Sequence, residues 1–131
     1  MTNVIEVLRQ HGIQPTPQRV AVAEFVLGTD THPTADEVWA AVRDRCPTLS
    51  RATIYNTLNL FAAKGLLKPQ PLKEGVVVFD AHVAPHHHLI DDETGKVFDV
   101  PGDAVKVTGE ASLEGFEVRE YQVVLRGRRR R

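Results

Sequence analysis

The sequence contains a single cysteine, Cys46, among its 131 residues. A lone cysteine forms no disulfide within the chain, which fits a reducing compartment such as the cytoplasm. It also excludes a zinc site built from four cysteines of one chain. No apolar run approaches the roughly 20 residues that cross a bilayer, and the N-terminus lacks the segments of a signal peptide. We therefore expect a cytoplasmic protein without a membrane partner.

The chain also has no strong net charge, because its formal value is −1 at pH 7. By charge alone the whole molecule is therefore not a binder of polyanions. Residues 1–79 carry 8 Lys and Arg against 7 Asp and Glu, whereas residues 80–131 carry 8 against 10. Five arginines lie near the C-terminus, at Arg126 and Arg128 to Arg131. They either contact an acidic surface such as phosphate, or form a solubilising tail. The middle of the second half is acidic, which suits cation binding better than DNA binding.

Four of the six histidines fall within seven positions of this acidic half. His86 and His88 are two residues apart in an extended segment, so both side chains are expected on one face. Two carboxylates, Asp80 and Asp99, stand close by in the sequence. The segment is therefore either a divalent-metal site or a solvated histidine-rich loop. His87 points to the opposite face of a regular strand, where we expect it to be exposed.

The first half of the sequence has the element order of a winged helix-turn-helix domain. Thr16 and Ser50 are predicted N-caps, and Thr34 with Glu37 forms a capping box. In this architecture the fourth helix enters the major groove and a hairpin contacts the DNA backbone. The predicted helices span residues 4–11, 17–27, 34–45 and 51–64, and the predicted hairpin joins strands 66–72 and 76–79.

The fourth predicted helix has one apolar face and one face without carboxylates. Ile54, Leu58 and Phe61 are spaced to point inward. The outer face is either an ordinary polar surface or a surface suited to reading bases and contacting phosphates. Together with the first turn of the second helix, it supplies the candidate DNA contacts Arg19, Ser50, Arg51, Thr53, Tyr55 and Asn56.

The second half predicts a small α/β module. A hairpin is expected over 89–100, a weak helix after Pro101 with Ala104, Val107 and Ala111 on one face, and a long final strand over 116–125. About 40 residues bury little core of their own, so we expect this sheet to pair with a second copy. The fold class is therefore α+β, with an N-terminal winged helix-turn-helix domain followed by a small α/β domain.

The chain resembles the ferric uptake regulator family of bacterial metal-dependent repressors, and most closely its peroxide-sensing branch. Several motifs, in order along the chain, carry this resemblance together. They are Thr16-Pro17-Gln18-Arg19, His32-Pro33-Thr34-Ala35-Asp36-Glu37, Ser50-Arg51-Ala52-Thr53-Ile54-Tyr55-Asn56-Thr57-Leu58, Phe79-Asp80, His86-His87-His88 and Gly95-Lys96-Val97-Phe98-Asp99.

The resemblance implies a DNA-binding domain with the hinge over 1–80 and a dimerisation and metal-sensing domain over 81–131. It also implies a homodimer that binds a double-stranded DNA operator and holds a regulatory metal. The implied ligands are His32, Asp80, His86, His88 and Asp99, drawn from both domains, so that the metal would lock the angle between them. Three imidazoles and two carboxylates without sulfur suit Fe²⁺ or Mn²⁺, and Zn²⁺ can also occupy such a site in vitro. The peroxide-sensing branch implies His32 and His86 as candidates for oxidation, with peroxide as the only small-molecule substrate.

One departure from the family pattern concerns its structural zinc. Many relatives carry two Cys-x-x-Cys pairs, whereas Asp91 and Thr94 stand at the first pair and nothing near the C-terminus supplies the second. We therefore expect no structural four-cysteine zinc. His82 is expected to be exposed, with a spare ligand of a second site as the alternative.

The expected function is a metal-loaded repressor that senses peroxide, and not an enzyme. The first alternative is a regulator that responds only to iron or manganese supply. The second is a small metallohydrolase, in which metal-bound water would be the nucleophile; no separate general base or substrate pocket is evident for it.

Overall fold

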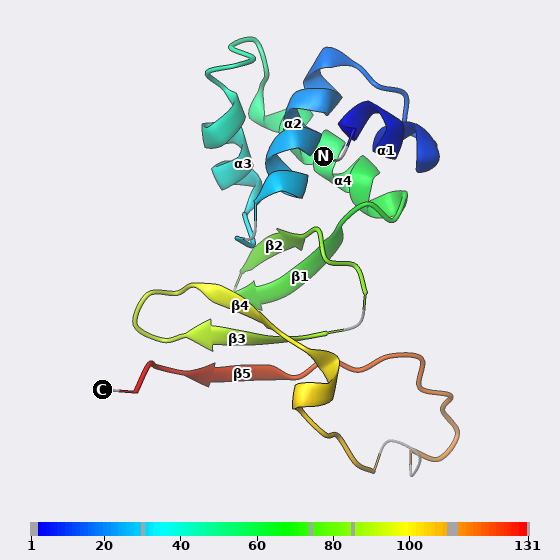
Figure 1. The fold of residues 1–131 in the computed structure, drawn as a ribbon, viewed down its shortest axis with the longest axis vertical. Coiled ribbons are helices and arrows are strands. Elements are labelled where there is room, and N and C mark those ends of the chain that lie inside the picture. Colours follow the sequence, from blue (N-terminus) through cyan, green and yellow to red (C-terminus); the bar gives the residue numbers. More distant parts are fainter. Residues whose placement is uncertain (1–2, 30, 74, 85, 110–112, 131) are drawn as a thin grey trace. The chain divides into compact units, whose positions relative to one another are not determined.

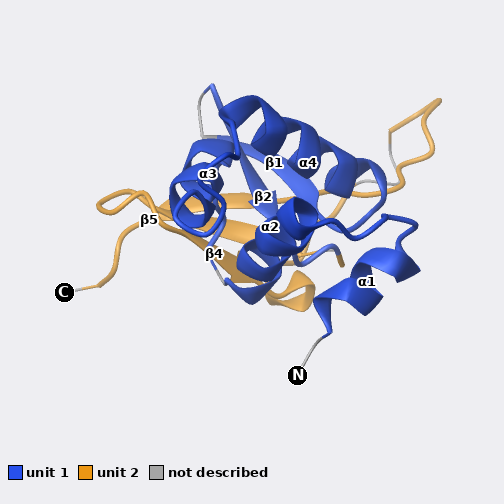
Figure 2. Cartoon of the chain, turned by 90° about the horizontal axis from the view of Figure 1, so that it is seen from above, with its two compact units in different colours: residues 1–83 blue, residues 84–131 orange. Residues whose placement is uncertain are grey.

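The computed structural model describes residues 3–29, 31–73, 75–84, 86–109 and 113–130. The chain divides into two compact units, residues 1–83 and residues 84–131 (Figure 2). No helix in the described ranges is long and apolar enough to cross a membrane.

The first unit contains four helices followed by a two-stranded hairpin (Figure 1). The helices are α1 (Val4–Gln10), α2 (Pro17–Gly28), α3 (Ala35–Val42) and α4 (Arg51–Ala63). The hairpin joins β1 (Lys68–Lys73) to β2 (Val76–Asp80) in antiparallel pairing. This is the predicted order of helices and wing, and the α+β fold class is confirmed.

Side-chain caps begin these helices where the sequence predicts them. Thr16 Oγ1 accepts the backbone N–H of Arg19, and Ser50 Oγ accepts that of Thr53. Thr34 and Glu37 form both hydrogen bonds of the capping box. Helix α3 ends at Val42 instead of near residue 45. Pro47 disfavours helical geometry in the residue before it, and residues 43–45 form a turn instead.

The core of the first unit lies where the inward faces of its helices meet. Ile54, Leu58 and Phe61 are fully buried, as the spacing in α4 predicts. The neighbouring helices contribute apolar side chains that are equally inaccessible, namely Leu8, Val22 and Val38. At about 25 cal/mol per Å² of apolar surface, burial of this cluster is the main term stabilising the unit.

The second unit is built on a three-stranded sheet. Its strands are β3 (His87–Asp91), β4 (Val97–Val100) and β5 (Val124–Gly127), in the spatial order β4-β3-β5. β3 pairs antiparallel with β4 and parallel with β5. Gly95 makes the turn between β3 and β4 with a φ of 75°, a conformation that glycine adopts without steric cost.

Two predictions for the second unit were wrong. The helix expected after Pro101 is reduced to a 3₁₀ turn, Gly102–Ala104, and residues 105–109 form no helix. Gly109 has a φ of 88°, and the preceding β-branched residues disfavour helix formation; Ala111 lies outside the described residues. The final strand covers only Val124–Gly127, because residues 116–123 form no ladder with β3.

The second unit buries few apolar side chains. Among its described residues, Ile90 is the only hydrophobic one that is buried. Several large apolar side chains remain exposed, most of all Phe116 at 82%. The others are Leu113, Val118, Tyr121, Val124 and Leu125.

Candidate metal centre

In the first unit, His32 and Asp80 form a buried imidazole–carboxylate pair. His32 Nε2 lies 3.4 Å from Asp80 Oδ2, and the two side chains are 2% and 5% exposed. The second carboxylate oxygen, Oδ1, accepts the backbone N–H of His82 at 2.9 Å. The side chain of Asp80 is therefore held with one oxygen toward the imidazole.

Backbone pairing explains how two residues 48 positions apart meet. The segment before α3 lies against β2, because the N–H of Phe79 donates to the carbonyl of Pro33 at 2.8 Å. Thr34 and Val78 form an antiparallel bridge directly beside this bond. His32 on one side and Asp80 on the other continue the same pairing, which places their side chains together.

In the second unit, His86, His88 and Asp99 form a group around a single carboxylate oxygen. Asp99 Oδ1 lies 3.1 Å from His86 Nε2 and 3.5 Å from His88 Nε2. The two imidazole rings are 4.6 Å apart, as expected for side chains on one face of a strand. His88 and Asp99 are also direct cross-strand partners of β3 and β4. Both histidines are buried, whereas the side chain of Asp99 is 38% exposed.

A backbone contact determines which ring nitrogen of His86 carries the proton. The other nitrogen faces Asp99. His86 Nδ1 lies 2.6 Å from the carbonyl oxygen of Ala84, a distance at which the ring nitrogen must donate. In a neutral imidazole Nε2 is then an unprotonated acceptor, and it faces a carboxylate oxygen. Two acceptors at this distance repel unless a cation lies between them. A proton on His86 or a metal ion satisfies this requirement.

The donor chemistry fits a divalent metal. Ligands about 2.1 Å from one ion lie about 3 to 3.5 Å apart in octahedral or tetrahedral geometry, which matches the N–O distances in this group. A backbone carbonyl that accepts from Nδ1–H is also the usual support of a metal-binding histidine. Neither the pair in the first unit nor the group in the second contains sulfur, and nitrogen and oxygen donors suit Fe²⁺ and Mn²⁺.

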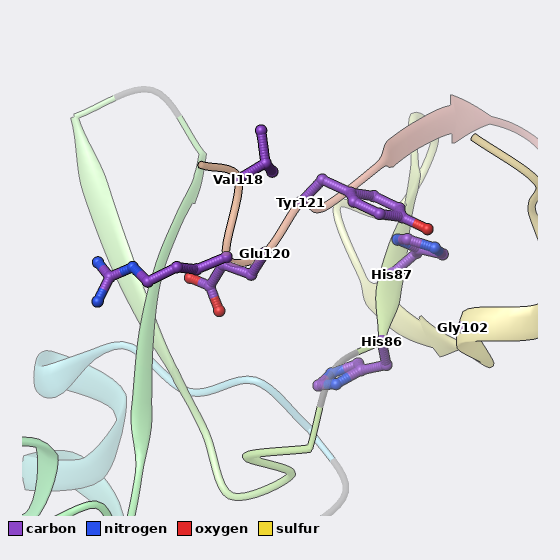
Figure 3. A pocket seen from close by; sticks show the side chains of 7 residues that line it. His86, His87, Gly102, Val118, Glu120 and Tyr121 are labelled. Atoms are coloured by element: carbon purple, nitrogen blue, oxygen red, sulfur yellow. The ribbon is translucent and has the colours of Figure 1, made fainter. Parts of the chain in front are cut away.

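His87 is buried, so its predicted exposure was wrong. Only 3% of the residue is accessible, and its Nδ1 accepts the backbone N–H of Val123 at 3.0 Å. Its ring stacks on Tyr121 with the centroids 6.0 Å apart (Figure 3). Residues 118–121 and His87 line the same cavity of about 270 Å³. The irregular segment before β5 therefore covers one face of the sheet. The alternation of side chains along the strand had predicted that this face is exposed to solvent. His82 is exposed, in agreement with its expected place.

Three of the predicted DNA-contacting residues lie together in the first unit. Arg19, Thr53 and Asn56 line one cavity of about 260 Å³ between α2 and α4. Arg19 also donates from Nη1 to the carbonyl of Gln14 at 3.0 Å, which orients its guanidinium group. This arrangement offers one cation, one hydroxyl and one amide on the same surface.

The other three predicted contacts have different surroundings. Ser50 is the N-cap of α4 and its Oγ is occupied by that role. Tyr55 is 46% exposed and lines a separate groove with Asn59, Val76 and Val77. Arg51 is exposed at the start of α4, and its Nη1 lies 4.0 Å from Asp36 Oδ1.

The sequence reasoning missed the surroundings of Trp39. The guanidinium carbons of Arg43 and Arg51 lie 5.0 Å and 4.7 Å from the centre of its ring system. The spacing of Trp39 and Arg43, four residues apart on one helix, was the available signal. The approach of Arg51 depends on tertiary structure.

Asp91 and Thr94, the two positions at which the family resemblance led us to look for cysteines, form a hydrogen-bonded turn. The backbone N–H of Glu93 donates to Asp91 Oδ1 at 2.9 Å. This bond is the main cause that lowers the pKa of Asp91 below its usual value, helped by Thr94 and by the positive charge of Arg129 and opposed by burial. The carboxylate is therefore stabilised in its charged form by the turn itself.

Most of the chain matches one known protein family. The sequence profile of the Ferric uptake regulator family matches residues 10–126. The chain is 33% identical over 130 residues to the peroxide operon regulator of Bacillus subtilis, covering 97% of this chain and 89% of that protein. It is 40% identical over 92 residues to the peroxide-responsive repressor PerR of Staphylococcus saprophyticus, a match that spans 70% of this chain and 62% of that relative.

Solved structures agree with these sequence matches. The ferric uptake regulator of Pseudomonas aeruginosa with manganese matches with a TM-score of 0.71 and 25% identity, over 99% of this chain and 100% of that one. PerR from Streptococcus pyogenes matches with a TM-score of 0.55 and 26% identity, over 96% and 88%. The ferric uptake regulator of Francisella tularensis with iron, at 21% identity and a TM-score of 0.75 over 89% and 92%, supports the fold.

Proposed function

Because the chain belongs to the ferric uptake regulator family, we propose that it is a metal-dependent transcriptional repressor that binds operator DNA. The observation that carries this proposal is the convergence of His86 Nε2 and His88 Nε2 on one oxygen of Asp99. The His86 Nε2 lone pair and the Asp99 oxygen require a proton or a metal ion between them, and a divalent metal fits the donor atoms. The relatives named above are regulators and repressors, so we propose no catalytic role.

The proposed metal ligands are His32 and Asp80 from the first unit with His86, His88 and Asp99 from the second. The pair in the first unit offers two ligands and the group in the second offers three. Neither set alone completes the coordination of Fe²⁺ or Mn²⁺, which commonly take five or six ligands. One ion shared by both sets would couple metal binding to the arrangement of the units. That coupling is how metal supply would control DNA binding.

Peroxide sensing is the finer part of the proposal. An Fe²⁺ ion held by these ligands would supply the redox chemistry that cleaves the O–O bond of hydrogen peroxide, and would return to Fe²⁺ in the net reaction. The chain would supply the group that is finally oxidised, a ring C–H of His32 or His86. In the net reaction one oxygen atom of peroxide enters this C–H bond and the other leaves as water. Peroxide gains the two electrons that the imidazole loses, and the altered imidazole no longer binds metal.

We further propose that the protein acts as a homodimer that pairs through its second unit. The described part of that unit buries Ile90 alone among its hydrophobic residues and leaves Phe116 and Leu125 exposed. A sheet with so little core gains stability from a second copy. Two copies would present two α4 helices to two half-sites of an operator.

The metal-dependence experiment measures binding to a fluorescent duplex from the protein's own promoter region. Fluorescence anisotropy is recorded for protein without metal and after addition of Mn²⁺ or, without oxygen, Fe²⁺. Tight binding only with metal is expected, and dimer mass is measured beside metal content. Equal binding with and without metal would disprove metal control.

The alternative, a regulator that responds only to metal supply, is favoured by the similarity to a ferric uptake regulator with manganese. The two functions differ in their response to peroxide. The Fe²⁺ form is treated briefly with hydrogen peroxide under anaerobic conditions, and peptides containing His32 or His86 are analysed by mass spectrometry. The Mn²⁺ form is the control. Gain of one oxygen atom in the Fe²⁺ form alone supports peroxide sensing, whereas unchanged peptides favour the alternative.

A further inference from the structure

Helix α3 carries a stripe that the proposed metal and DNA sites do not use, with exposed Asp36 and Arg43 on either side of the partly buried Trp39. Asp36, Trp39 and Arg43 are three and four residues apart, so they follow one face of the helix to its C-cap. The indole N–H of Trp39 donates to the carbonyl of Leu49 at 3.1 Å, in the segment that leads into α4. The ring is therefore fixed between the end of one helix and the start of the next.

Two guanidinium groups share this fixed ring. Arg43, the C-cap of α3, lies 5.0 Å from the ring centre, and Arg51, the first residue of α4, lies 4.7 Å from it. Both distances are within the range of cation–π attraction. Because both distances are measured to one ring centre, the two guanidinium carbons are at most about 10 Å apart, a separation at which like charges still repel. An anion placed between them or beside both would relieve that repulsion.

Neither cation is neutralised by a close acidic partner within the described ranges. Arg51 and Asp36 are 4.0 Å apart, with side chains 62% and 60% exposed, so water and salt screen their attraction. Arg43 makes no ion pair within the part of the chain that the structure describes. Arg45, only two residues away, differs because it forms an ion pair with Glu24.

We propose that Arg43 and Arg51 form a clamp for the phosphate backbone of DNA, with Trp39 as its positioning residue. Guanidinium groups bind phosphate with two parallel hydrogen bonds, and a stacked guanidinium loses less freedom on binding. The clamp continues the surface that begins at the N-terminus of α4, where no acidic residue occupies the first turn. The inference rests on the proposed DNA-binding function and adds Arg43 and Trp39 to it.

The first test measures the salt dependence of binding to a short duplex of arbitrary sequence, with metal-loaded protein. Removal of one phosphate-binding cation lowers the slope of log affinity against log salt by about 0.9. Arg43→Gln and Arg51→Gln should each lower the slope by about one per bound chain and weaken binding about threefold to tenfold. Arg45→Gln is the matched control, because it removes an equal charge two residues away in the chain from an arginine that already pairs with Glu24, and it should leave the slope unchanged.

The second test concerns Trp39. Trp39→Leu removes the ring and should weaken DNA binding about threefold, whereas Trp39→Phe keeps a ring and should retain most of the affinity. In a chain that already carries Arg43→Gln and Arg51→Gln, Trp39→Leu should cause no further loss. A purely structural role would weaken binding by the same factor in both backgrounds, and thermal unfolding of each variant measures that role directly.

Asp36 provides a test with the opposite sign. Asp36→Asn removes the carboxylate nearest to Arg51 and should strengthen binding to the same duplex about twofold to threefold. An unchanged salt slope in Arg43→Gln, with the wild-type protein binding normally, would overturn the clamp alone. Failure of the metal-loaded wild type to bind any duplex would overturn the proposed function as well.

Discussion

His86 Nε2 faces Asp99 Oδ1 at 3.1 Å, while the other nitrogen of the same ring donates to the carbonyl of Ala84. In the neutral imidazole this relationship directs the lone pair of Nε2 toward a carboxylate, which suits the metal binding proposed above. The carbonyl that fixes the ring comes only two residues earlier in the chain. A short loop therefore orients the ring of this proposed ligand.

Removal of a proposed ligand should abolish metal control without unfolding the chain. We expect His88→Ala or Asp99→Ala to weaken Mn²⁺ binding at least tenfold to a hundredfold, measured by calorimetry. DNA binding at limiting metal should fall in parallel. His82→Ala is the control, because its side chain is exposed and lies near the same segment. Unaltered Mn²⁺ affinity in His88→Ala would remove this residue from the ligand set.

Metal affinity should decrease in mild acid. A histidine binds metal only when the coordinating nitrogen is unprotonated, and a free imidazole becomes protonated near pH 6.5. Three histidine ligands should therefore make Mn²⁺ binding fall steeply as pH drops below about 6.5. Titration of Mn²⁺ at several pH values measures the effect. A constant affinity between neutral pH and pH 5 would contradict histidine ligation.

Asn56 should matter for DNA recognition and not for metal. It lies on the exposed face of α4 beside Arg19 and Thr53. A side-chain amide that reads adenine contributes about 1 to 3 kcal/mol of discrimination. Asn56→Ala should weaken operator binding accordingly and leave Mn²⁺ affinity unchanged. Asn59→Ala, one turn farther along α4, is the comparison, and an equal loss in both variants would argue against specific reading by Asn56.

Ser50 was predicted as a DNA contact, but its hydroxyl caps α4. Ser50→Ala should lower the free energy of unfolding by about 1 kcal/mol, whereas Ser50→Asn should preserve it. Chemical denaturation of the metal-free protein measures both. Operator binding by Ser50→Asn then shows whether the serine also contacts DNA. Full stability in Ser50→Ala would mean that the cap contributes nothing.

Asp91 should make the free energy of unfolding depend on pH in the acidic range. Its pKa is lowered in the folded chain, chiefly by the N–H of Glu93, so the charged carboxylate favours folding. This contribution is complete above the pKa of the unfolded chain, near 3.8, and is lost as pH falls through the lower folded value. Asp91→Asn should therefore be less stable than wild type at neutral pH and lose less stability on acidification. Denaturation at pH 7 and pH 3 measures the difference, and parallel curves would contradict the prediction.

Local sequence signals determined the helices and the wing. Thr16, Thr34 and Ser50 begin helices because a side-chain oxygen can accept a nearby backbone N–H whatever the rest of the chain does. The 3.6-residue period likewise indicated which face of α4 is buried. Where the local signal was weak, as after Pro101, the prediction failed.

Tertiary structure decided which distant residues contact the side chains that the sequence had singled out. The period of a strand placed His86 and His88 on one face, but only the register of β3 and β4 brings Asp99 to them. Residues 118–121, more than 30 positions away, bury His87, and a loop carbonyl fixes the ring of Trp39 beside Arg51. A sequence period reports which side of an element a residue occupies. Which distant segment covers that side depends on packing across the whole unit, and that information is not local.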